Sequence, residues 1–569
     1  DLTNNTALEE LYCGGNQLTS LDVRNGNNSN MTYFNTLGNV SLSTINVDNA
    51  TWSTTNWLQS VNIDTWTTFT AIYQVYVPDA NFRAELLSLG LGIVFDSNNE
   101  TPSTSVNTIT NLTLFNVNIS DLTGISGFTA LEVFDCRQNQ LTTIDVSQNT
   151  LLTHLYPGLN QLTSLDVSNN PNLITLYCHL NQLTSLDLSS NTALKNLVCR
   201  NNQLTSLDVS NCPVLLMIHC ATNPITSLNL TNCGQLFRLT AYGTNLTGLD
   251  TSTNTALVDL DVIANQLTTL DVSNNTALEN FSCSDNQLTS LDVSTNTALI
   301  LLVCKNNNIT SIDVSTLTDL EDLRCHINQL TTLDVSNNTA LTRLYCASNQ
   351  LTTLDISNNT VLTYLHVGGN DYLAAYGAYN NLITSLDLSN NISLETLYCG
   401  FNQLTTLDVS NNTALTYLDC SNNFTITNTT SAVGLGQLTS LDLSNNPALT
   451  YLICSYNQLT SLDLRNGNNT NMTLISIANY PLLNINVDNV AWSDSNWPLA
   501  IGDTNKEGVG HVGYGDRFLT TNNQGQYVTN WKDGDTNGDG FVDSVDLDIV
   551  NTNFNLINGT IDAWTSFIA

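Results

Sequence analysis

The residues best suited to chemistry lie near the carboxyl end of the sequence, between residues 535 and 546. Carboxylate or amide oxygens stand at positions 1, 3, 5, 9 and 12 of this segment, with glycine at position 6. Hard oxygen ligands at this spacing wrap a calcium ion, and the glycine allows the sharp turn. The sequence therefore predicts a Ca²⁺ site, with an Asp/Gly-rich turn without metal as the alternative. The expected ligands are the side chains of Asp535, Asn537, Asp539, Asp543 and Asp546 and the backbone carbonyl of Phe541.

Apart from this calcium site, the sequence has no group of residues that suggests chemistry, and none that indicates catalysis. The histidines lack His-x-x-x-His spacing, and the sequence has no Gly-x-Ser-x-Gly motif or phosphate-binding loop. The chain carries 49 Asp and Glu but only 13 Lys and Arg, a formal net charge of -36. Nucleic-acid binding requires a basic surface instead, and no apolar run of about 18 residues is present to span a membrane. We expect a non-enzymatic protein that binds no nucleic acid and has no membrane span.

The elements that would position these residues follow from a repeat of 21 residues. The pattern of residues 173–189 recurs in residues 194–210. One turn of this length cannot bury its own apolar face, so stacked neighbours must supply the core. The slot that Cys178 occupies recurs fifteen times, at residues 136, 157, 178, 199, 220, 241, 262, 283, 304, 325, 346, 367, 399, 420 and 454.

The pattern Leu-x-x-Leu-x-Cys-x-x-Asn-x-Leu resembles the leucine-rich repeat. Each turn should contribute one short parallel strand whose Leu and Cys side chains point into a shared core. The recurring Asn, as at Asn139 and Asn160, should form a ladder that satisfies backbone groups at the bend. The predicted fold class is a repeat solenoid with 21-residue turns and a parallel β-sheet on the concave face. Mostly loop and short-helical structure is expected on the convex side, with a small calcium-loop insert at the carboxyl end.

The residues between the apolar positions of each strand vary from turn to turn and should face the concave side. Tyr and Arg supply much of the binding energy of interfaces, so these columns predict a recognition surface; freely variable scaffold positions are the alternative. The residues expected to bind a ligand are Arg137, Tyr156, Tyr177, Arg200, His219, Arg238, Arg324, Arg343 and Tyr345. The same columns also hold His154, His179, Lys195, Lys305, His326, Tyr364, His366, Tyr398, Tyr417 and Tyr451.

An acidic residue follows the third leucine of the repeat in 14 of the 15 turns, and Asn229 is the exception. Stacked like charges repel, so a compensating interaction is needed. The sequence Asp-x-Ser-x-Asn is typical of an Asx turn, in which the carboxylate accepts backbone N–H bonds from its own turn. We favour this structural role over a cation-collecting stripe.

The 14 cysteines fall into two groups. Twelve of the 14 occupy the inward column, where we expect free thiols that act as small buried apolar residues. Cys212 and Cys233 instead occupy an asparagine slot in adjacent turns. Stacked turns would place their Cα atoms about 5 Å apart, within the disulfide range. A disulfide between them is possible on this spacing, with two loop thiols as the alternative.

A pattern that ends the array occurs twice. Residues 22–26 match residues 463–467, Trp52 and Trp57 match Trp492 and Trp497, and residues 63–69 reappear as 561–567. We expect one full module preceded by the tail of another, with two unequal arrays in one protein as the alternative. The expected domains are 1–71 (tail and closing cap of a preceding module), 72–130 (opening cap), 131–465 (solenoid of 15 turns), 466–502 (closing cap), 503–560 (insert with the calcium loop) and 561–569 (terminal segment resembling 63–71).

The turns and both caps are similar to those of leucine-rich repeat proteins secreted by Bacteroidetes. The likeness is carried by residues 76–82 and 119–125 in the opening cap and by 465–473 and 486–488 in the closing cap. The loop at 535–546 resembles the dockerin calcium loop, although the dockerin pattern has two such loops. The resemblance implies export to the cell surface or medium and no single activity.

Three functions fit these patterns. The first is a secreted structural protein, in which modules joined head to tail by self-association or covalent continuation build an extracellular fibre or stalk with calcium-stiffened junctions. The second is a surface adhesin or binding module that recognises a glycan or protein through its concave face. The third, a dockerin-type subunit of an enzyme assembly, has the least support, because the chain has one good calcium loop and no enzyme domain.

Overall fold

The computed structural model of the 569-residue chain describes residues 2–488, apart from 3, 27, 49–52, 54–56, 58–62, 65, 66, 71–73, 370–379, 424–436 and 478–483. The chain divides into two compact units, Asp1–Gly502 and Asp503–Ala569. The predicted calcium loop at 535–546 and the terminal segment at 561–569 lie outside the described residues. In the part of the chain that is described, no helix is long and apolar enough to cross a membrane.

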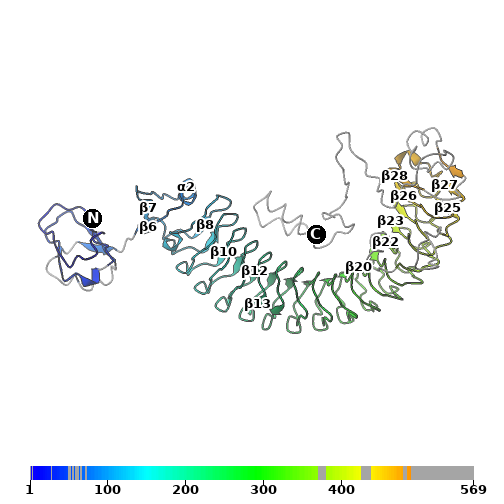
Figure 1. Cartoon of the computed structure of the whole chain (residues 1–569), viewed down its shortest axis with the longest axis horizontal. Helices are drawn as coiled ribbons and strands as arrows, with labels where there is room; N and C mark the ends of the chain where they lie inside the picture. Colours follow the sequence, from blue (N-terminus) through cyan, green and yellow to red (C-terminus); the bar gives the residue numbers. More distant parts are fainter. Residues whose placement is uncertain are drawn as a thin grey trace, which may run out of the picture. The chain divides into compact units, whose positions relative to one another are not determined.

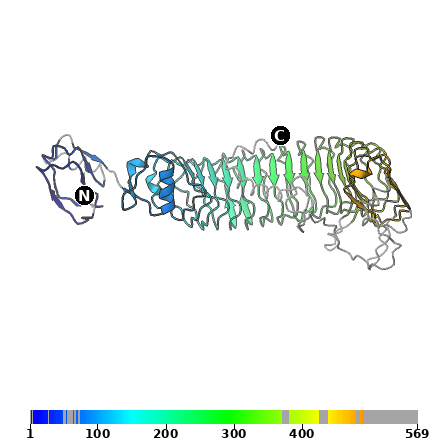
Figure 2. The ribbon, with the colours of Figure 1, turned by 90° about the horizontal axis from the view of Figure 1, so that it is seen from above.

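The main array contributes one strand per turn to a parallel sheet, which lies on the inner side of the arc in Figure 1 and is seen face-on in Figure 2. Neighbouring strands pair in register, with the middle leucines opposite each other, as for Leu176 and Leu197. The predicted leucine-rich repeat solenoid is therefore confirmed. Its described strands are β8 (Asn111–Thr113), β9 (Val133–Asp135), β10 (His154–Tyr156), β11 (Thr175–Tyr177), β12 (Asn196–Val198), β14 (Met217–His219), β16 (Arg238–Thr240), β17 (Asp259–Asp261), β18 (Asn280–Ser282), β19 (Leu301–Val303), β20 (Asp322–Arg324), β21 (Arg343–Tyr345), β22 (Tyr364–His366), β23 (Thr396–Tyr398), β24 (Tyr417–Asp419), β26 (Tyr451–Ile453) and β28 (Leu474–Ser476).

The core repeats the same side chains turn after turn. The middle residue of each strand and the cysteine that follows it point inward, and both Leu302 and Cys304 are fully buried. Burial raises the pKa of the Cys304 thiol to about 12, so it stays protonated and acts as an apolar residue. Two residues after the cysteine the backbone turns sharply, with a φ of 55° at Asn201 and also at Ile327. A β-branched residue rarely adopts this left-handed conformation, so the bend needs support.

That support comes from the predicted asparagine ladder. The Nδ2 atom of Asn202 donates to the carbonyl oxygens of Cys178 and Cys199, at 3.0 Å each. Its Oδ1 atom accepts from the backbone N–H of Leu183, also at 3.0 Å. Each ladder asparagine thus ties its own bend to the preceding turn, which satisfies buried backbone groups that water cannot reach.

A second asparagine ladder, which the sequence analysis did not predict, runs through the opposite bend. Asn191 donates from Nδ2 to the carbonyl oxygens of Val167 at 3.1 Å and Asn170 at 2.9 Å. The same pair of bonds recurs along the array, where each donor reaches back to the turn before it. The members are Asn149, Asn170, Asn191, Asn254, Asn275, Asn296, Asn338, Asn359, Asn391, Asn412 and Asn446.

Cys212 and Cys233 occupy two slots of this second ladder, and both thiols are free. The Sγ atom of Cys233 lies 3.2 Å from the carbonyl oxygen of Val209, where an asparagine would place its Nδ2 atom. The Sγ atom of Cys212 points the same way, 4.0 Å from the carbonyl oxygen of Leu188. Because both thiols point toward the preceding turn, they do not face each other. The possible disulfide is therefore not formed, and the two cysteines replace ladder asparagines.

The acidic column forms the predicted Asx turns. The Oδ1 atoms of Asp187 and Asp313 each accept a 2.9 Å bond from the backbone N–H of the serine two residues later. Hydrogen bonds from the Ser315 side chain and then from its backbone N–H hold the pKa of the Asp313 carboxyl below its usual value. Asn229, the exception, donates from Nδ2 to Asp208 Oδ1 at 3.0 Å, where β13 (Ser206–Asp208) pairs with β15 (Ser227–Asn229). The column therefore caps its own turns.

Different caps cover the two ends of the main array. At the start, helix α2 (Ala80–Ser88) buries Phe82 and Leu86 completely, and Asp79 caps it by accepting from the N–H groups of Asn81 and Phe82. The remaining elements of the opening cap are β6 (Gln74–Tyr76), β7 (Glu100–Pro102), η2 (Ser103–Ser105) and η3 (Ile125–Gly127). The end of the array contains β25 (Ser440–Asp442), β27 (Ser461–Asp463), η5 (Asn469–Asn471) and β29 (Asn484–Asn486).

Residues 2–70 repeat this closing arrangement around a small core of their own. Phe34 stacks on Trp57 with ring centroids 4.4 Å apart, and Ile45 is fully buried beside them. The elements are β1 (Glu10–Tyr12), β2 (Leu21–Asp22), η1 (Asn28–Asn30), β3 (Tyr33–Asn35), β4 (Thr44–Asn46) and β5 (Thr68–Thr70).

Candidate ligand-binding surface

Three columns of side chains face outward from the sheet of the main array. They are the first and third residues of each strand and the residue after the cysteine slot, and we call them the concave columns. All nine residues predicted to bind a ligand lie in them. Arg238 and Arg343 begin their strands, Tyr156, Tyr177, His219, Arg324 and Tyr345 end theirs, and Arg137 and Arg200 follow the cysteine slot.

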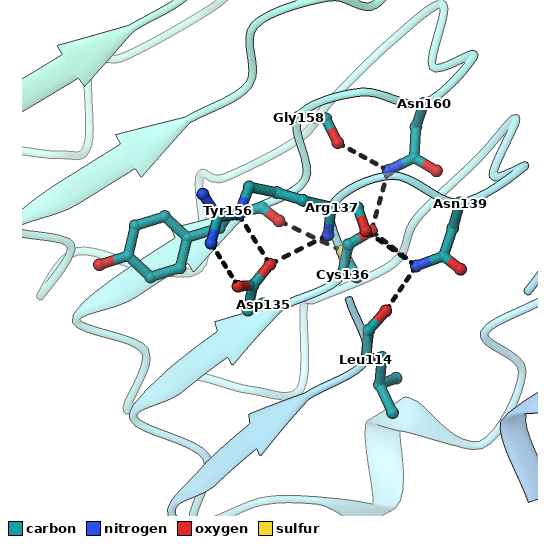
Figure 3. Close-up of polar contacts among 8 residues, drawn as sticks. All are labelled: Leu114, Asp135, Cys136, Arg137, Asn139, Tyr156, Gly158 and Asn160. Atoms are coloured by element: carbon teal, nitrogen blue, oxygen red, sulfur yellow. Dashed lines mark hydrogen bonds and ion pairs between the residues drawn. The ribbon is translucent and has the colours of Figure 1, made fainter. Parts of the chain in front are cut away.

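The first cluster lies on β9–β11 and joins an ion pair to two tyrosines; Figure 3 shows the ion pair and Tyr156. Arg137 clasps Asp135 with two bonds, Nε to Oδ1 at 3.0 Å and Nη2 to Oδ2 at 2.7 Å. The Arg137 guanidinium lies 5.4 Å from the centre of the Tyr156 ring, a cation–π distance. Tyr156 meets Tyr177 edge-on at 5.3 Å. The strands therefore hold three predicted site residues in one contiguous group.

The central cluster, on β11–β17, contains the buried His179 and the half-buried His219 beside arginines. Burial and the positive charge of Arg200 lower the pKa of His179 and of His219 to about 3, so both rings are neutral at pH 7. Arg238 is paired with Asp259 on the next strand, with Nη2 and Oδ2 2.7 Å apart. One polar group is thus formed by His219, Arg200 and Arg238. Within it, the charge of Arg238 faces the Asp259 carboxylate.

The third cluster is a tyrosine ladder on β21–β26, formed by Tyr345, Tyr364, Tyr398, Tyr417 and Tyr451. Tyr345 and Tyr364 stack with centroids 4.5 Å apart, and Tyr398 and Tyr417 meet at 4.6 Å. Tyr451 continues the stack at 5.8 Å from Tyr417. Burial and the neighbouring phenols raise the pKa of Tyr364 and Tyr417, so these two rings are uncharged at any physiological pH.

Arginines flank the start of this tyrosine ladder. The Arg324 guanidinium lies 5.1 Å from the centre of the Tyr345 ring. Arg324 and Arg343 share one carboxylate, Asp322, at 3.0 and 3.8 Å. Three of the predicted site residues therefore meet the tyrosine ladder at one place.

Acidic residues on the strands balance much of the arginine charge on the predicted surface. Asp135, Asp259 and Asp322 pair with four of the predicted arginines. Two of these pairs have a sequence signal, because Asp-x-Arg on a strand places both side chains on the same face. The surface is thus chiefly aromatic, with paired charges at its edges.

No metal centre is formed by the residues that the structure describes. Among them, no group of three or more His, Cys, Asp or Glu side chains is placed to hold a metal ion. The calcium ligands predicted from the sequence belong to residues 535–546, outside those ranges.

Comparison with known proteins identifies the family to which this chain belongs. Neither a family model nor a curated protein matches the chain. Among solved structures, the functional domain of InlJ from Listeria monocytogenes is 36% identical over 62% of this chain and 77% of that chain, with a TM-score of 0.56. YopM from Yersinia enterocolitica is 23% identical over 65% of this chain and 76% of that one, with a TM-score of 0.47. The InlJ domain includes a cysteine ladder, and eleven buried cysteines form an inward column here. On this likeness and on its own solenoid of 21-residue turns, the chain belongs to the leucine-rich repeat proteins.

Proposed function

We propose that this chain is a non-enzymatic extracellular recognition module that binds a protein ligand across the tyrosine ladder and its flanking arginines. One observation carries the proposal: five tyrosines from five successive strands of the sheet form an unbroken row of ring contacts beside Arg324 and Arg343. Clusters of Tyr and Arg of this kind supply most of the energy in protein interfaces.

The way the rings pack favours a protein over a glycan. A sugar ring binds tyrosine best by lying flat on an open ring face. In this ladder the facing surfaces of Tyr345 and Tyr364 are covered by each other, as are those of Tyr398 and Tyr417. Ring faces covered in this way are closed to a sugar, whereas packed tyrosine side chains suit the carbonyl and apolar groups of a polypeptide.

The test uses the full chain as a probe on a protein array and on a glycan array. We expect specific signal on the protein array that falls at least tenfold when Tyr364→Ala and Tyr398→Ala are combined. Ile392→Ala is the matched control, because Ile392 is a large side chain, 61% exposed, in the turn before β23. Equal losses for the control, or signal on the glycan array alone, would reject the proposal.

A structural role is the second function that an observation supports. The ion pair of Arg24 with Asp22 in the first closing cap recurs as that of Arg465 with Asp463 in the second. Two copies of one cap support modules arranged head to tail, in an extracellular fibre or stalk. Electron microscopy of the native material should show extended particles with a regular axial repeat, whereas isolated compact particles would argue against this role.

Calcium belongs to this second proposal. Four aspartates and one asparagine in residues 535–546 would supply oxygen ligands, together with the Phe541 carbonyl. Calorimetry of the full chain should detect one Ca²⁺ site with a dissociation constant of about 0.1–1 mM, as in extracellular modules. Asp539→Asn should weaken it at least tenfold, while Asp313→Asn, outside the loop, should not. Unchanged binding in the first variant would place the ion elsewhere.

A further inference from the structure

The two closing caps allow the same residues to be compared in two surroundings. β1, β2, η1, β3 and β4 correspond in order to β26, β27, η5, β28 and β29. Even a weak contact is repeated, since Asn46 donates to Asp22 and Asn486 donates to Asp463, both at 3.4 Å. Any difference in burial between the two copies therefore reflects their neighbours rather than their own folds.

The apolar residues of the two copies differ on one side only. Around β26, the side chains of Leu449, Leu452, Cys454 and Leu459 are all fully buried. Their counterparts around β1 are Leu8, Leu11, Cys13 and Leu18, and each is only half-buried. On the other side of β1 the packing is complete, because Phe34 and Ile45 are buried there. The exposed apolar surface thus lies along the edge of β1 that faces away from β3.

Hydrogen bonds differ on the same side. Asn457 donates from Nδ2 to Cys420 O, in the preceding turn, at 3.0 Å, and to Cys454 O in its own turn at 3.1 Å. Its counterpart Asn16 keeps the bond within its own turn, to Cys13 O at 2.9 Å, and has no bond to another turn in the described residues.

In the second ladder, too, the first cap lacks the hydrogen bonds to a preceding turn. Asn446 is fully buried and donates to Val409 O at 3.0 Å and Asn412 O at 2.9 Å. Its counterpart Asn5 is exposed and reaches only Leu2 O, at 3.4 Å. Asn16 and Asn5, the ladder asparagines of the first turn in this cap, are therefore built for a preceding turn that the described residues do not supply.

We infer that this leading edge of β1 is an interface for one further leucine-rich turn of the same 21-residue type, supplied by the same polypeptide on the amino-terminal side of β1. Throughout the main array, the strand on the leading side belongs to the preceding turn of the same chain, as β24 does for β26. A helix such as α2, which covers the leading end of the main array, would leave both asparagines without carbonyl partners. The inference rests on the head-to-tail arrangement proposed above and identifies the surface through which the arrays continue.

The test extends the full chain with its own turns. Residues 313–354, two 21-residue turns that end at Leu354 just before an aspartate, are fused directly in front of Asp1. This junction keeps the register, because Leu441 likewise precedes Asp442 and Leu443 in the second copy. The control fuses residues 303–344, which have the same length in a shifted register. Alkylation of Cys13 by N-ethylmaleimide, followed by peptide mass spectrometry, reports its burial, and Cys454 serves as the internal standard.

In the unextended chain, Cys13 should react at least tenfold faster than Cys454. The in-register extension should slow Cys13 at least tenfold, and the shifted extension should leave its rate unchanged. An unchanged rate in the in-register fusion, with the amides of Glu10 and Tyr12 still fast in hydrogen exchange, would overturn the inference. Protection of Cys13 that rises with the concentration of the unextended chain would instead assign the interface to a second copy. Protection by fusion without fibres in the native material would reject only the head-to-tail role.

Discussion

Two kinds of column run along the array, and they follow different rules. The ladder position holds asparagine in almost every turn and makes the same bonds each time, as at Asn202 and Asn307. The third residue of each strand changes from one turn to the next, from Val198 in β12 to His219 in β14 and Thr240 in β16. The repeated columns hold the fold, so the variable columns are free to carry recognition. Repetition therefore indicates a structural role here, and variation indicates the candidate site.

The largest effect should come from a ladder asparagine. Asn307→Ala removes the acceptor of the Leu288 N–H and the donor to the carbonyl oxygens of Cys283 and Cys304. Leaving such buried groups without partners should lower the free energy of unfolding by about 3–5 kcal/mol. The matched control is Asn280→Ala in a concave column, expected to cost about 1 kcal/mol or less. Urea unfolding measures both, and equal losses would remove the distinction between the columns.

The second-largest effect on the free energy of unfolding should come from acid, through His219 in a variable column. The pKa of His219 is lowered to about 3 by burial, then by Arg200 and Arg238, whereas in the unfolded chain it is about 6.5. Below pH 6.5 the unfolded state therefore binds the extra proton, and stability falls as the pH falls. The loss reaches up to about 3 kcal/mol at pH 4.

His219→Gln should remove part of this loss between pH 6.5 and 4, measured by urea unfolding at each pH. The aspartates of the Asx turns act in a different window. The pKa of Asp313 is lowered, so its contribution is present above about pH 3.9 and lost only below that. An unchanged pH profile in the variant would show that His219 does not cause the acid loss.

A smaller effect is expected in the cysteine column. Cys304 is fully buried, and Cys304→Ala should cost about 1 kcal/mol for the lost volume. Cys304→Ser should cost about 2 kcal/mol, because it buries a hydroxyl in an apolar layer. Differential scanning calorimetry of the two variants decides the order, and a serine variant as stable as the alanine variant would mean that the column tolerates polar groups.

The smallest effect belongs to a repeated column that is exposed. Asp313→Asn keeps an Oδ1 atom that can accept the 2.9 Å bond from the Ser315 N–H, as Asn229 does for Thr231 at 3.2 Å. We expect almost no change in melting temperature at pH 7, and a clear decrease for Asp313→Ala. A large loss for the asparagine variant would show that charge, rather than capping, maintains this column.

Much of the fold was predictable because its contacts repeat. The 21-residue period alone predicts that Leu302 and Cys304 lie in the core and Asn202 in a ladder. The Asx turn of Asp313 was equally visible, since donor and acceptor are two residues apart. Contacts inside one turn, or between a turn and its identical neighbour, need no knowledge of the rest of the chain.

The candidate site was predictable only in part. The sequence placed Arg238 in a concave column, but its pairing with Asp259 depends on two strands lying in register. The stack of Tyr364 on Tyr345 likewise joins the first residue of one strand to the third of its neighbour. Spacing in the chain cannot determine this diagonal tyrosine contact, because it depends on the rotamers of two different side chains.

The period, the inward-pointing residues and the family follow from the sequence alone, because every turn repeats the same pattern. The folded structure was needed to show that Cys212 and Cys233 stay apart, because their thiols point in one direction along the stack. The folded structure was also needed to show that Leu11 and Leu452, which occupy the same position of the motif, differ in burial. The physical reason is the same in both cases: burial and pairing depend on what lies on the next turn, which the sequence of a single turn does not contain.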